Sequence, residues 1–240
     1  TVSDWLTASP NLTRLILSNN QLTLWPRALS QARMVRELDL SGNLFARGPD
    51  AQTELGAGLL AFAAGAALEI LALNKLALVA LPPSLFEITS LRSLSLSHNL
   101  LTGLPTNLEK LSSLVILNVS HNEHLQQLPD SVSKLNSLRE LNASHCWLSE
   151  LPASIGALVE LRSLDVSDSR LQSLPNTIGR LLNLTTLDIS STRVTRLPPS
   201  VRLLTRLQLL RCADNVMEQP PASVCRQGAR AVRDYFNQLV

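Results

Sequence analysis

The sequence is poor in aromatic side chains and cysteines, and its charges nearly cancel. Aromatic residues make up 3% of the 240 residues, three residues are cysteine, and the formal net charge at pH 7 is +2. With both signs interspersed, the chain lacks the basic surface that attracts nucleic acids or acidic membranes. The apolar stretch GPDAQTELGAGLLAFAAGAA is too short and too interrupted to span a bilayer. We therefore expect no nucleic-acid partner and no membrane insertion.

What the chain does have is a sequence repeat that is maintained over almost its whole length. Six of the eight spacings between successive units are 23 residues. The nine units begin at Leu12, Val35, Leu68, Leu91, Leu114, Leu138, Leu161, Leu184 and Leu207. Each unit follows LxxLxLSxNxLxxLPxxIxxLxx, as in LRSLSLSHNLLTGLPTNLEKLSS. Chance could supply one copy but not a maintained period, and the pattern is identified as a leucine-rich repeat.

The period within each unit predicts the fold. LxLxx alternates with period two, as in a short strand with one buried face. The following Leu-Pro ends the strand, because proline lacks the donor that a ladder needs. Later apolar residues three apart, such as Ile155 and Leu158, suit a helical or 3₁₀ turn. Since one unit cannot bury its own leucines, the units must stack. We expect an α/β leucine-rich repeat solenoid: a curved horseshoe with a parallel concave sheet and a helical, 3₁₀ and irregular convex side.

Two units depart from the common length. The second unit, from Val35 to Leu68, is longer by ten residues, which predict a helical insertion on the convex side near residues 48–67. The fifth is longer by a single residue, because HNEHLQQLP carries one more than HNLLTGLP, which predicts a bulge in a turn. The expected organisation is a cap or the tail of a preceding repeat at 1–11, nine repeats at 12–227, and a capping helix at 228–240. We expect one face of this helix to cover the last unit with Ala231, Val232, Tyr235, Phe236 and Leu239.

With LPASIGAL and LPNTIGRL, residues 12–240 resemble the intracellular Ras-group leucine-rich repeat proteins of the 23-residue type. This class includes Scribble-like scaffolds, Ras-suppressor-like proteins and Roco GTPases. Many members also end in a segment like DNVMEQPPASVCRQGARAVRDYFNQL, although Val216 stands where proline is usual. The resemblance implies a non-catalytic scaffold that binds another protein, such as a small GTPase or a signalling protein, and needs no cofactor.

Two alternatives stay open at this stage. The chain could be the targeting or regulatory arm of a larger signalling enzyme, such as a GTPase, a kinase or a ubiquitin ligase. It could also be a phosphatase-regulating repeat protein, although those resemble a 22-residue repeat.

The cysteines of the chain, Cys146, Cys212 and Cys225, are odd in number and have no paired spacing. Because extracellular proteins of this type usually close their ends with disulfide clusters, we expect a cytoplasmic location.

Position nine of the unit explains the adjacent His145 and Cys146. In the family that the chain resembles, this position points inward and donates hydrogen bonds to backbone carbonyls of neighbouring units. Here it is occupied by Asn20, Asn43, Leu76, Asn99, Asn122, Cys146, Ser169, Thr192 and Asn215. Leu76 cannot donate, so its turn should be modified. Cys146 is a member of this ladder, whereas His145 at position eight should face the concave side. We therefore predict no catalytic dyad.

His98, His121 and His145 occupy position eight of consecutive units, about one strand spacing apart. A column of imidazoles could bind a metal or act as a pH switch. The alternative is that LSHN is simply a common form of this repeat, and we favour it. The prediction is that the chain has no metal site.

The concave face should bind the partner through exposed positions of its C-terminal half. Trp147 at position ten is the expected anchor, and we expect it to form one edge of a patch with four arginines. Three aspartates should supply the opposite sign and steer the partner. The predicted partner-binding residues are Arg139, Glu140, His145, Trp147, Arg162, Asp165, Asp168, Arg170, Asp188, Arg193 and Arg211. Trp25, at a position that is normally leucine, should lie in the core.

Overall fold

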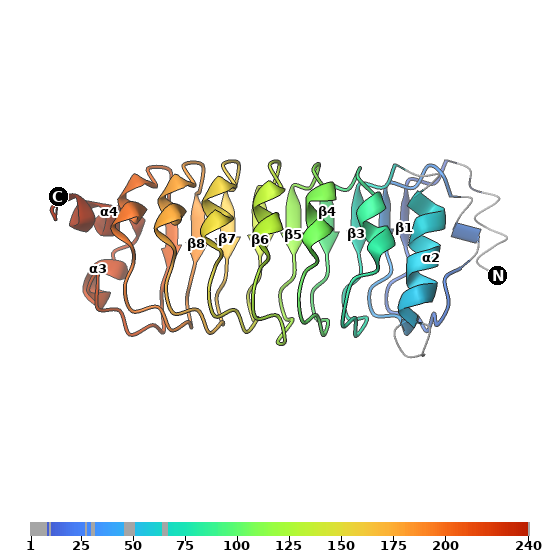
Figure 1. The fold of residues 1–240 in the computed structure, drawn as a ribbon, viewed down its shortest axis with the longest axis horizontal. Helices are drawn as coiled ribbons and strands as arrows, with labels where there is room; N and C mark the ends of the chain where they lie inside the picture. Colours follow the sequence, from blue (N-terminus) through green and yellow to red (C-terminus); the bar gives the residue numbers. More distant parts are fainter. Residues whose placement is uncertain are drawn as a thin grey trace.

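The protein is a row of coils that stack along one axis (Figure 1). The structure is a computed structural model that describes residues 9, 11–26, 28–29, 32–45, 51–63 and 67–239. Nine strands form one parallel sheet in chain order, β1 to β9. They are β1 (Arg14–Ile16), β2 (Glu37–Asp39), β3 (Ile70–Ala72), β4 (Ser93–Ser95), β5 (Ile116–Asn118), β6 (Glu140–Asn142), β7 (Ser163–Asp165), β8 (Thr186–Asp188) and β9 (Leu209–Arg211). The predicted parallel-sheet solenoid is confirmed.

The register of the sheet follows position four of the repeat. Leu15, Leu38 and Leu71 are paired in the first three strands, and the same position pairs through every later strand to Leu210. Leu38 pairs with Leu71 across the long second unit, and Leu117 pairs with Leu141 across the fifth unit with its single extra residue. The insertion and the bulge are therefore accommodated outside the strands.

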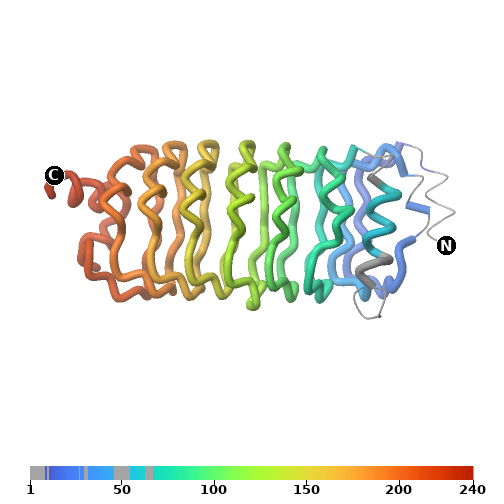
Figure 2. Tube along the Cα trace, viewed as in Figure 1, coloured from blue at the N-terminus to red at the C-terminus, as the bar shows by residue number. Residues whose placement is uncertain are grey.

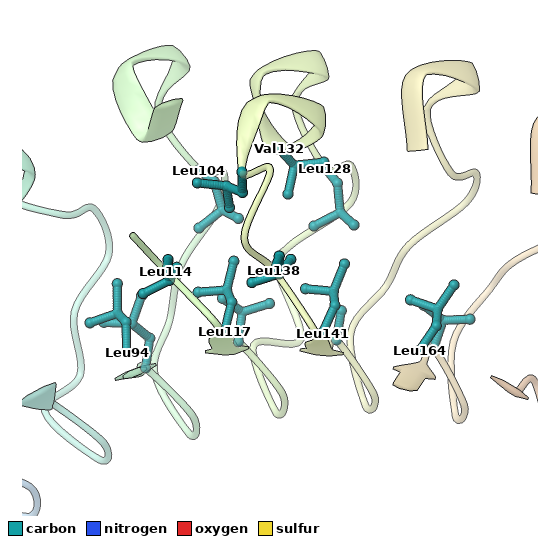
Figure 3. Close-up of a cluster of buried hydrophobic side chains, with 14 of the residues drawn as sticks. Leu94, Leu104, Leu114, Leu117, Leu128, Val132, Leu138, Leu141 and Leu164 are labelled. Atoms are coloured by element: carbon teal, nitrogen blue, oxygen red, sulfur yellow. The ribbon is translucent and has the colours of Figure 1, made fainter. Parts of the chain in front are cut away.

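A 3₁₀ turn faces the sheet in each coil from the third to the eighth. The turns are η3 (Pro83–Glu87), η4 (Thr106–Lys110), η5 (Asp130–Lys134), η6 (Ala153–Ala157), η7 (Asn176–Arg180) and η8 (Pro199–Leu203). An extended proline precedes each turn, as Pro152 does with φ −62° and ψ 142°. Apolar residues of turn and strand then meet in the interior, where Leu128, Val132 and Leu141 are almost fully buried. Figure 3 shows this continuous leucine core passing from coil to coil.

The position-nine ladder is present. Asn122 Nδ2 donates to Leu96 O and Val119 O, and Asn122 Oδ1 accepts from Leu101 N, so this buried amide is satisfied on both sides. Leu76 is buried and donates through its backbone N–H to Asn99 Oδ1 instead. Its turn is modified as predicted, because Ala77 is left-handed at φ 55° in addition to the usual position-eight residue.

The insertion contains α2 (Ala51–Ala63), which packs against η3. Ser84 Oγ donates to Gly56 O at 2.7 Å, and the rings of Trp25 and Phe62 meet edge to face with centroids 6.1 Å apart. Trp25 is 8% exposed, so its predicted core position is confirmed. The insertion therefore extends the core on the side of the 3₁₀ turns (Figure 1).

The C-terminal end is covered by α3 (Ala222–Cys225) and α4 (Ala229–Asn237). Val232 and Phe236 are buried as predicted, but Leu239 is 59% exposed. Its predicted packing is wrong, because α4 ends at Asn237 and Ala229 fills the buried face from the other end of the helix. Arg233 Nη1 donates to three backbone oxygens where the eighth coil passes into the ninth: Leu204 O, Thr205 O and Leu207 O.

The predicted cap at 1–11 lies outside the described residues, apart from Ser9 and Asn11. Among the helices that the structure describes, none is both long and apolar enough to cross a membrane.

Candidate functional site

Position eight has the same unusual backbone in every coil. Its φ is positive in all nine units, between 51° at Asp168 and 67° at Gly42. Asn, Asp, His and Gly adopt this left-handed conformation more readily than other residues, and they fill seven of the nine positions. Because parallel coils repeat this geometry, their position-eight side chains form a row at the carboxyl ends of the strands.

Three histidines of this row stack on one another. The ring centroids of His98 and His121 are 4.0 Å apart with planes at 8°, and those of His121 and His145 are 4.1 Å apart at 11°. His145 Nε2 lies 3.5 Å from Asp168 Oδ2, which extends the row by one coil. Burial, followed by the neighbouring His98 and His145, lowers the pKa of His121. The stack therefore favours the neutral form of its central ring.

The neighbouring His145 and Cys146 face apart, as predicted. The His145 side chain is 46% exposed, whereas Cys146 is fully buried. Cys146 Sγ donates to Val119 O at 3.3 Å, and burial raises the pKa of this thiol to about 11. The thiol belongs to the position-nine ladder and has the properties of an unreactive core cysteine.

No metal centre is assembled by the histidines. In the part of the chain that the structure describes, no group of three His, Cys, Asp or Glu side chains could hold a metal ion. The near-parallel stacking explains this for the three rings, because stacked imidazoles direct their nitrogens outward along parallel planes and not toward a common point.

Trp147 is held in place by two neighbours. Arg170 Cζ lies 4.0 Å from the centroid of the Trp147 ring, which is a cation–π contact between position ten of adjacent coils. His124 meets the same indole edge to face at 5.4 Å and 83°. Trp147 is half-buried by these contacts, and Arg170 and His124 are exposed. A large aromatic side chain is thus fixed at the surface beside the histidine stack.

The predicted arginines lie in two rows. Arg139 and Arg162 directly precede β6 and β7, whereas Trp147 and Arg170 follow the ends of these strands. The predicted patch therefore draws on two rows, because positions two and ten lie on opposite sides of each strand, and its binding of a partner stays a prediction. The row at the strand ends, which continues to Arg193, contains the tryptophan, and the row at the strand starts contains Glu140 beside Arg139.

The predicted aspartates are mostly engaged within the chain. Asp165 Oδ1 accepts from Ser167 N and Oγ, and Asp188 Oδ1 accepts from Ser190 N and Oγ in the same way. Asp188 is 7% exposed and also lies 3.3 Å from Arg211 Nη1. These carboxylates order the turn after the strand, and Asp168 beside His145 is the more exposed of the acids.

The charges of the two halves differ in their pairing. On the N-terminal strands, Arg14 pairs with Glu37 at 2.9 Å and Arg36 with Glu69 at 2.5 Å. By contrast, four arginines of the C-terminal half have no ion-pair partner among the residues described: Arg139, Arg162, Arg170 and Arg193. Surface cations without an internal partner are available to a ligand.

Sequence reasoning missed His124 and the contact between neighbouring rings. The signal for His124 was present in the sequence. His124 lies in the stretch that makes the fifth unit longer, and it directly precedes the buried Leu125, just as Trp147 precedes the buried Leu148 one coil later. The residue types at position eight were also a signal, because histidine and aspartate are enriched where φ is positive.

Comparisons with known proteins agree with the repeat. A leucine-rich repeat region model matches residues 148–224, a leucine rich repeat model matches residues 66–123 and 90–148, and a third matches residues 11–32. No curated protein matches the sequence.

Two solved structures resemble the whole solenoid. A leucine-rich repeat protein of Leptospira interrogans is 24% identical with a TM-score of 0.75, over 93% of this chain and 60% of its own. The leucine-rich repeat ectodomain of the Arabidopsis thaliana membrane receptor kinase GASSHO1/SCHENGEN3, solved with CASPARIAN STRIP INTEGRITY FACTOR 2, is 30% identical with a TM-score of 0.71. That match covers 90% of this chain and 26% of the receptor chain. The chain thus spans less than two thirds of either protein.

Proposed function

Because the chain is a leucine-rich repeat solenoid, we propose that it is a non-catalytic scaffold that binds another protein on the concave face of its C-terminal half. Leucine-rich repeat domains are generally protein–protein interaction modules. The stacked coils present a long, regular surface that no single coil could form. We locate the binding site on the last four coils, which hold the half-buried Trp147 and the four arginines without an ion-pair partner among the residues described.

The observation that carries the proposal is the anchored Trp147. Tryptophan and arginine are the residues that most often dominate the binding energy of protein interfaces. Here Arg170 covers one part of the indole at 4.0 Å and His124 another, so little side-chain freedom is left to lose on binding. A partner that covers this cluster would bury an aromatic side chain already in its bound position.

The other predicted residues take different roles in this proposal. Arg193 continues the position-ten row one coil beyond Arg170, and His145 lies two residues before Trp147, while Arg139, Glu140 and Arg162 contact the partner at the strand starts. The exposed Asp168 gives the opposite sign on the turn side. Three residues between the two rows support the surface through contacts within the chain, namely Asp165, Asp188 and Arg211.

We further propose that the protein is of the Ras-group type and acts in the cytoplasm with a small GTPase or another signalling protein. The close approach of Gly156 and Gly179 to the following coils gives a physical reason for their LPxxIG motif. The three cysteines are free and buried, which suits a reducing compartment. The receptor ectodomain, whose structure includes a bound factor, is a precedent for ligand binding by a solenoid of similar shape.

A comparative capture experiment tests the binding site. The wild-type chain and a Trp147→Ala, Arg170→Glu variant are immobilised and incubated with cell lysate, and the bound proteins are quantified by mass spectrometry. The matched control is Leu100→Ala, Arg92→Glu, which removes an exposed position-ten side chain, 45% exposed, and reverses an exposed arginine in the N-terminal half. Circular dichroism first establishes that all three chains fold.

We expect proteins that bind the wild type and the control but not the Trp147 variant. Loss of an aromatic anchor and reversal of its arginine should weaken binding by roughly 1,000-fold, since hot-spot residues contribute about 2 kcal/mol or more each. Titration of the purified partner measures this directly. If the same proteins bind all three chains with equal affinity, the concave site is wrong.

A further inference from the structure

Two of the three cysteines meet at the C-terminal end of the solenoid. Cys212 directly follows β9, and Cys225 is the last residue of α3. They are 9% and 5% exposed, Cys225 Sγ donates to Pro220 O at 3.6 Å, and the two thiols are near enough to shift each other's pKa. Cys212 occupies position six, which is Leu, Val, Ile or Ala in each of the other eight coils. A thiol therefore replaces an aliphatic core side chain only where a second thiol contacts it.

The two thiols shift each other's pKa in opposite directions. A hydrogen bond from Cys212 lowers the pKa of Cys225, because it stabilises the thiolate that accepts it. The same bond, together with burial, raises the pKa of Cys212. Cys225 is therefore the nucleophile of the pair and Cys212 the resolving thiol. Cys146 lies far from either in the sequence and is fully buried, so it serves as an internal reference.

The pair opens into a cavity of about 680 Å³. Both thiols line this cavity together with Met217 and Gly228. Arg226 and Arg211, the latter paired with Asp188, provide positive charge at its wall, and Asp214 provides a negative charge. The cavity lies between the ninth coil and the segment that follows it. Figure 2 shows this segment at the C-terminal end of the tube. Small molecules with carboxylates can approach the sulfurs through such an opening.

We propose that Cys212 and Cys225 are a reversible disulfide site that is oxidised by small anionic disulfides of the glutathione disulfide class. The Cys225 thiolate attacks one sulfur of the small disulfide, and the other sulfur leaves as a thiolate that takes up a proton. Cys212 then loses its proton and attacks Cys225 Sγ, expelling the second small thiolate. Two protein thiols become one disulfide, and one small disulfide becomes two thiols.

The crosslink would tie the cap to the repeat array. The sheet ends at β9, while α3 contacts α4 and α4 contacts η8. A covalent bond from the ninth coil to α3 therefore resists the opening of the whole C-terminal cap. Closing a short loop of this kind should raise the unfolding midpoint by roughly 5 °C.

The test uses the full chain and glutathione disulfide. After reaction, alkylation and trypsin cleavage, both cysteines are found in one peptide, residues 212–226, because Arg211 precedes it and Arg226 ends it. The expected product is this peptide without alkylation and two hydrogens lighter than its reduced form. The separate peptide that contains Cys146 should be fully alkylated. Cys212→Ala should stop at a stable mixed disulfide on Cys225. Cys225→Ala should leave Cys212 reacting at least about tenfold more slowly than Cys225 does in the wild type.

Cys146→Ala is the matched control and should react like the wild type. The proposal is overturned if the wild type acquires glutathione equally on all three cysteines, or if the 212–226 disulfide forms no faster in the folded chain than in denaturant. It is also overturned if Cys212 in a folded Cys225→Ala chain reacts with glutathione disulfide as fast as Cys225 does in the wild type. Should a variant fail to fold by circular dichroism, the comparison of folded and denatured wild type decides alone.

Discussion

At the scale of single residues, position eight connects the sequence to the site. Its left-handed backbone at His98, His121 and His145 fixes where each imidazole leaves the chain. Since adjacent parallel strands are about 4.8 Å apart, three rings that leave in the same direction stack. The repeat alone places the histidines in one row. That their planes lie within about ten degrees of parallel depends on side-chain rotamers, which the pattern does not determine.

The stack makes stability depend on pH through His121. Its pKa is lowered from 6.5, mainly by burial and then by the two neighbouring imidazoles. As the pH falls through 6.5, the unfolded chain takes up a proton before the folded chain does. The free energy of unfolding should therefore decrease on acidification until the lowered pKa is passed. Asp168 and Glu123 act in the opposite direction and limit the effect.

Thermal unfolding at about pH 7.5 and pH 5.5 measures this dependence. We expect His121→Asn, which tolerates the left-handed backbone, to lose less stability on acidification than the wild type. His124→Asn is the matched control, because it removes an exposed imidazole outside the stack. Equal losses in the wild type and the His121 variant would show that the stack does not titrate in this way.

At the scale of elements, glycine sets the distance between neighbouring 3₁₀ turns. A Cβ at Gly156 would lie 2.4 Å from Thr177 O, and one at Gly179 would lie 2.4 Å from Ser200 O. The turns η6, η7 and η8 can approach each other only because these positions lack a side chain. The sequence motif LPxxIG could be recognised without the structure, but the contact that requires its glycine could not.

Gly179→Ala should destabilise the protein. The added methyl group meets the backbone of η8, which cannot move without displacing the buried Val201, so we expect a loss of about 1 to 3 kcal/mol. Gly103→Ala is the control, since its Cβ would meet nothing within 4 Å. Urea unfolding monitored by circular dichroism compares the two. A Gly179 variant as stable as the Gly103 variant would contradict the packing described.

The insertion shows where sequence analysis stops at this scale. Its composition predicted a helix, and α2 is present. Its docking could not be foreseen, because Trp25 lies against Gly58 so closely that a Cβ would be 2.1 Å from Trp25 Cδ2. These residues belong to different coils and are related by no repeat position. The specific fit of one ring to one glycine has no periodic signal.

At the scale of the whole molecule, the period predicted the sheet but not the grouping of surface residues. Every strand register follows from position four, because a slip by one residue would turn the leucines outward. The period also assigns surface residues to rows. Our prediction of the patch joined Arg139 to Trp147 although they are at opposite ends of β6, and charge type alone gave no reason to separate them.

A linear array also predicts how the molecule unfolds. Each coil contacts only its neighbours, so a defect in the last coil should loosen the C-terminal end and leave the central coils protected. Leu210 in β9 is 6% exposed and contributes to the core. Leu210→Ala should cost about 2 to 5 kcal/mol. Leu209, the preceding residue of the same strand, is 39% exposed, and Leu209→Ala is the matched control.

Hydrogen exchange followed by mass spectrometry separates local from global loosening. In the Leu210→Ala chain, amides of β9, α3 and α4 should exchange faster than in the wild type, while those of β4 and β5 keep their protection. The control should match the wild type throughout. Equal acceleration from β4 to α4 would mean that the nine coils open as one cooperative unit, and the nearest-neighbour description of this solenoid would then be wrong.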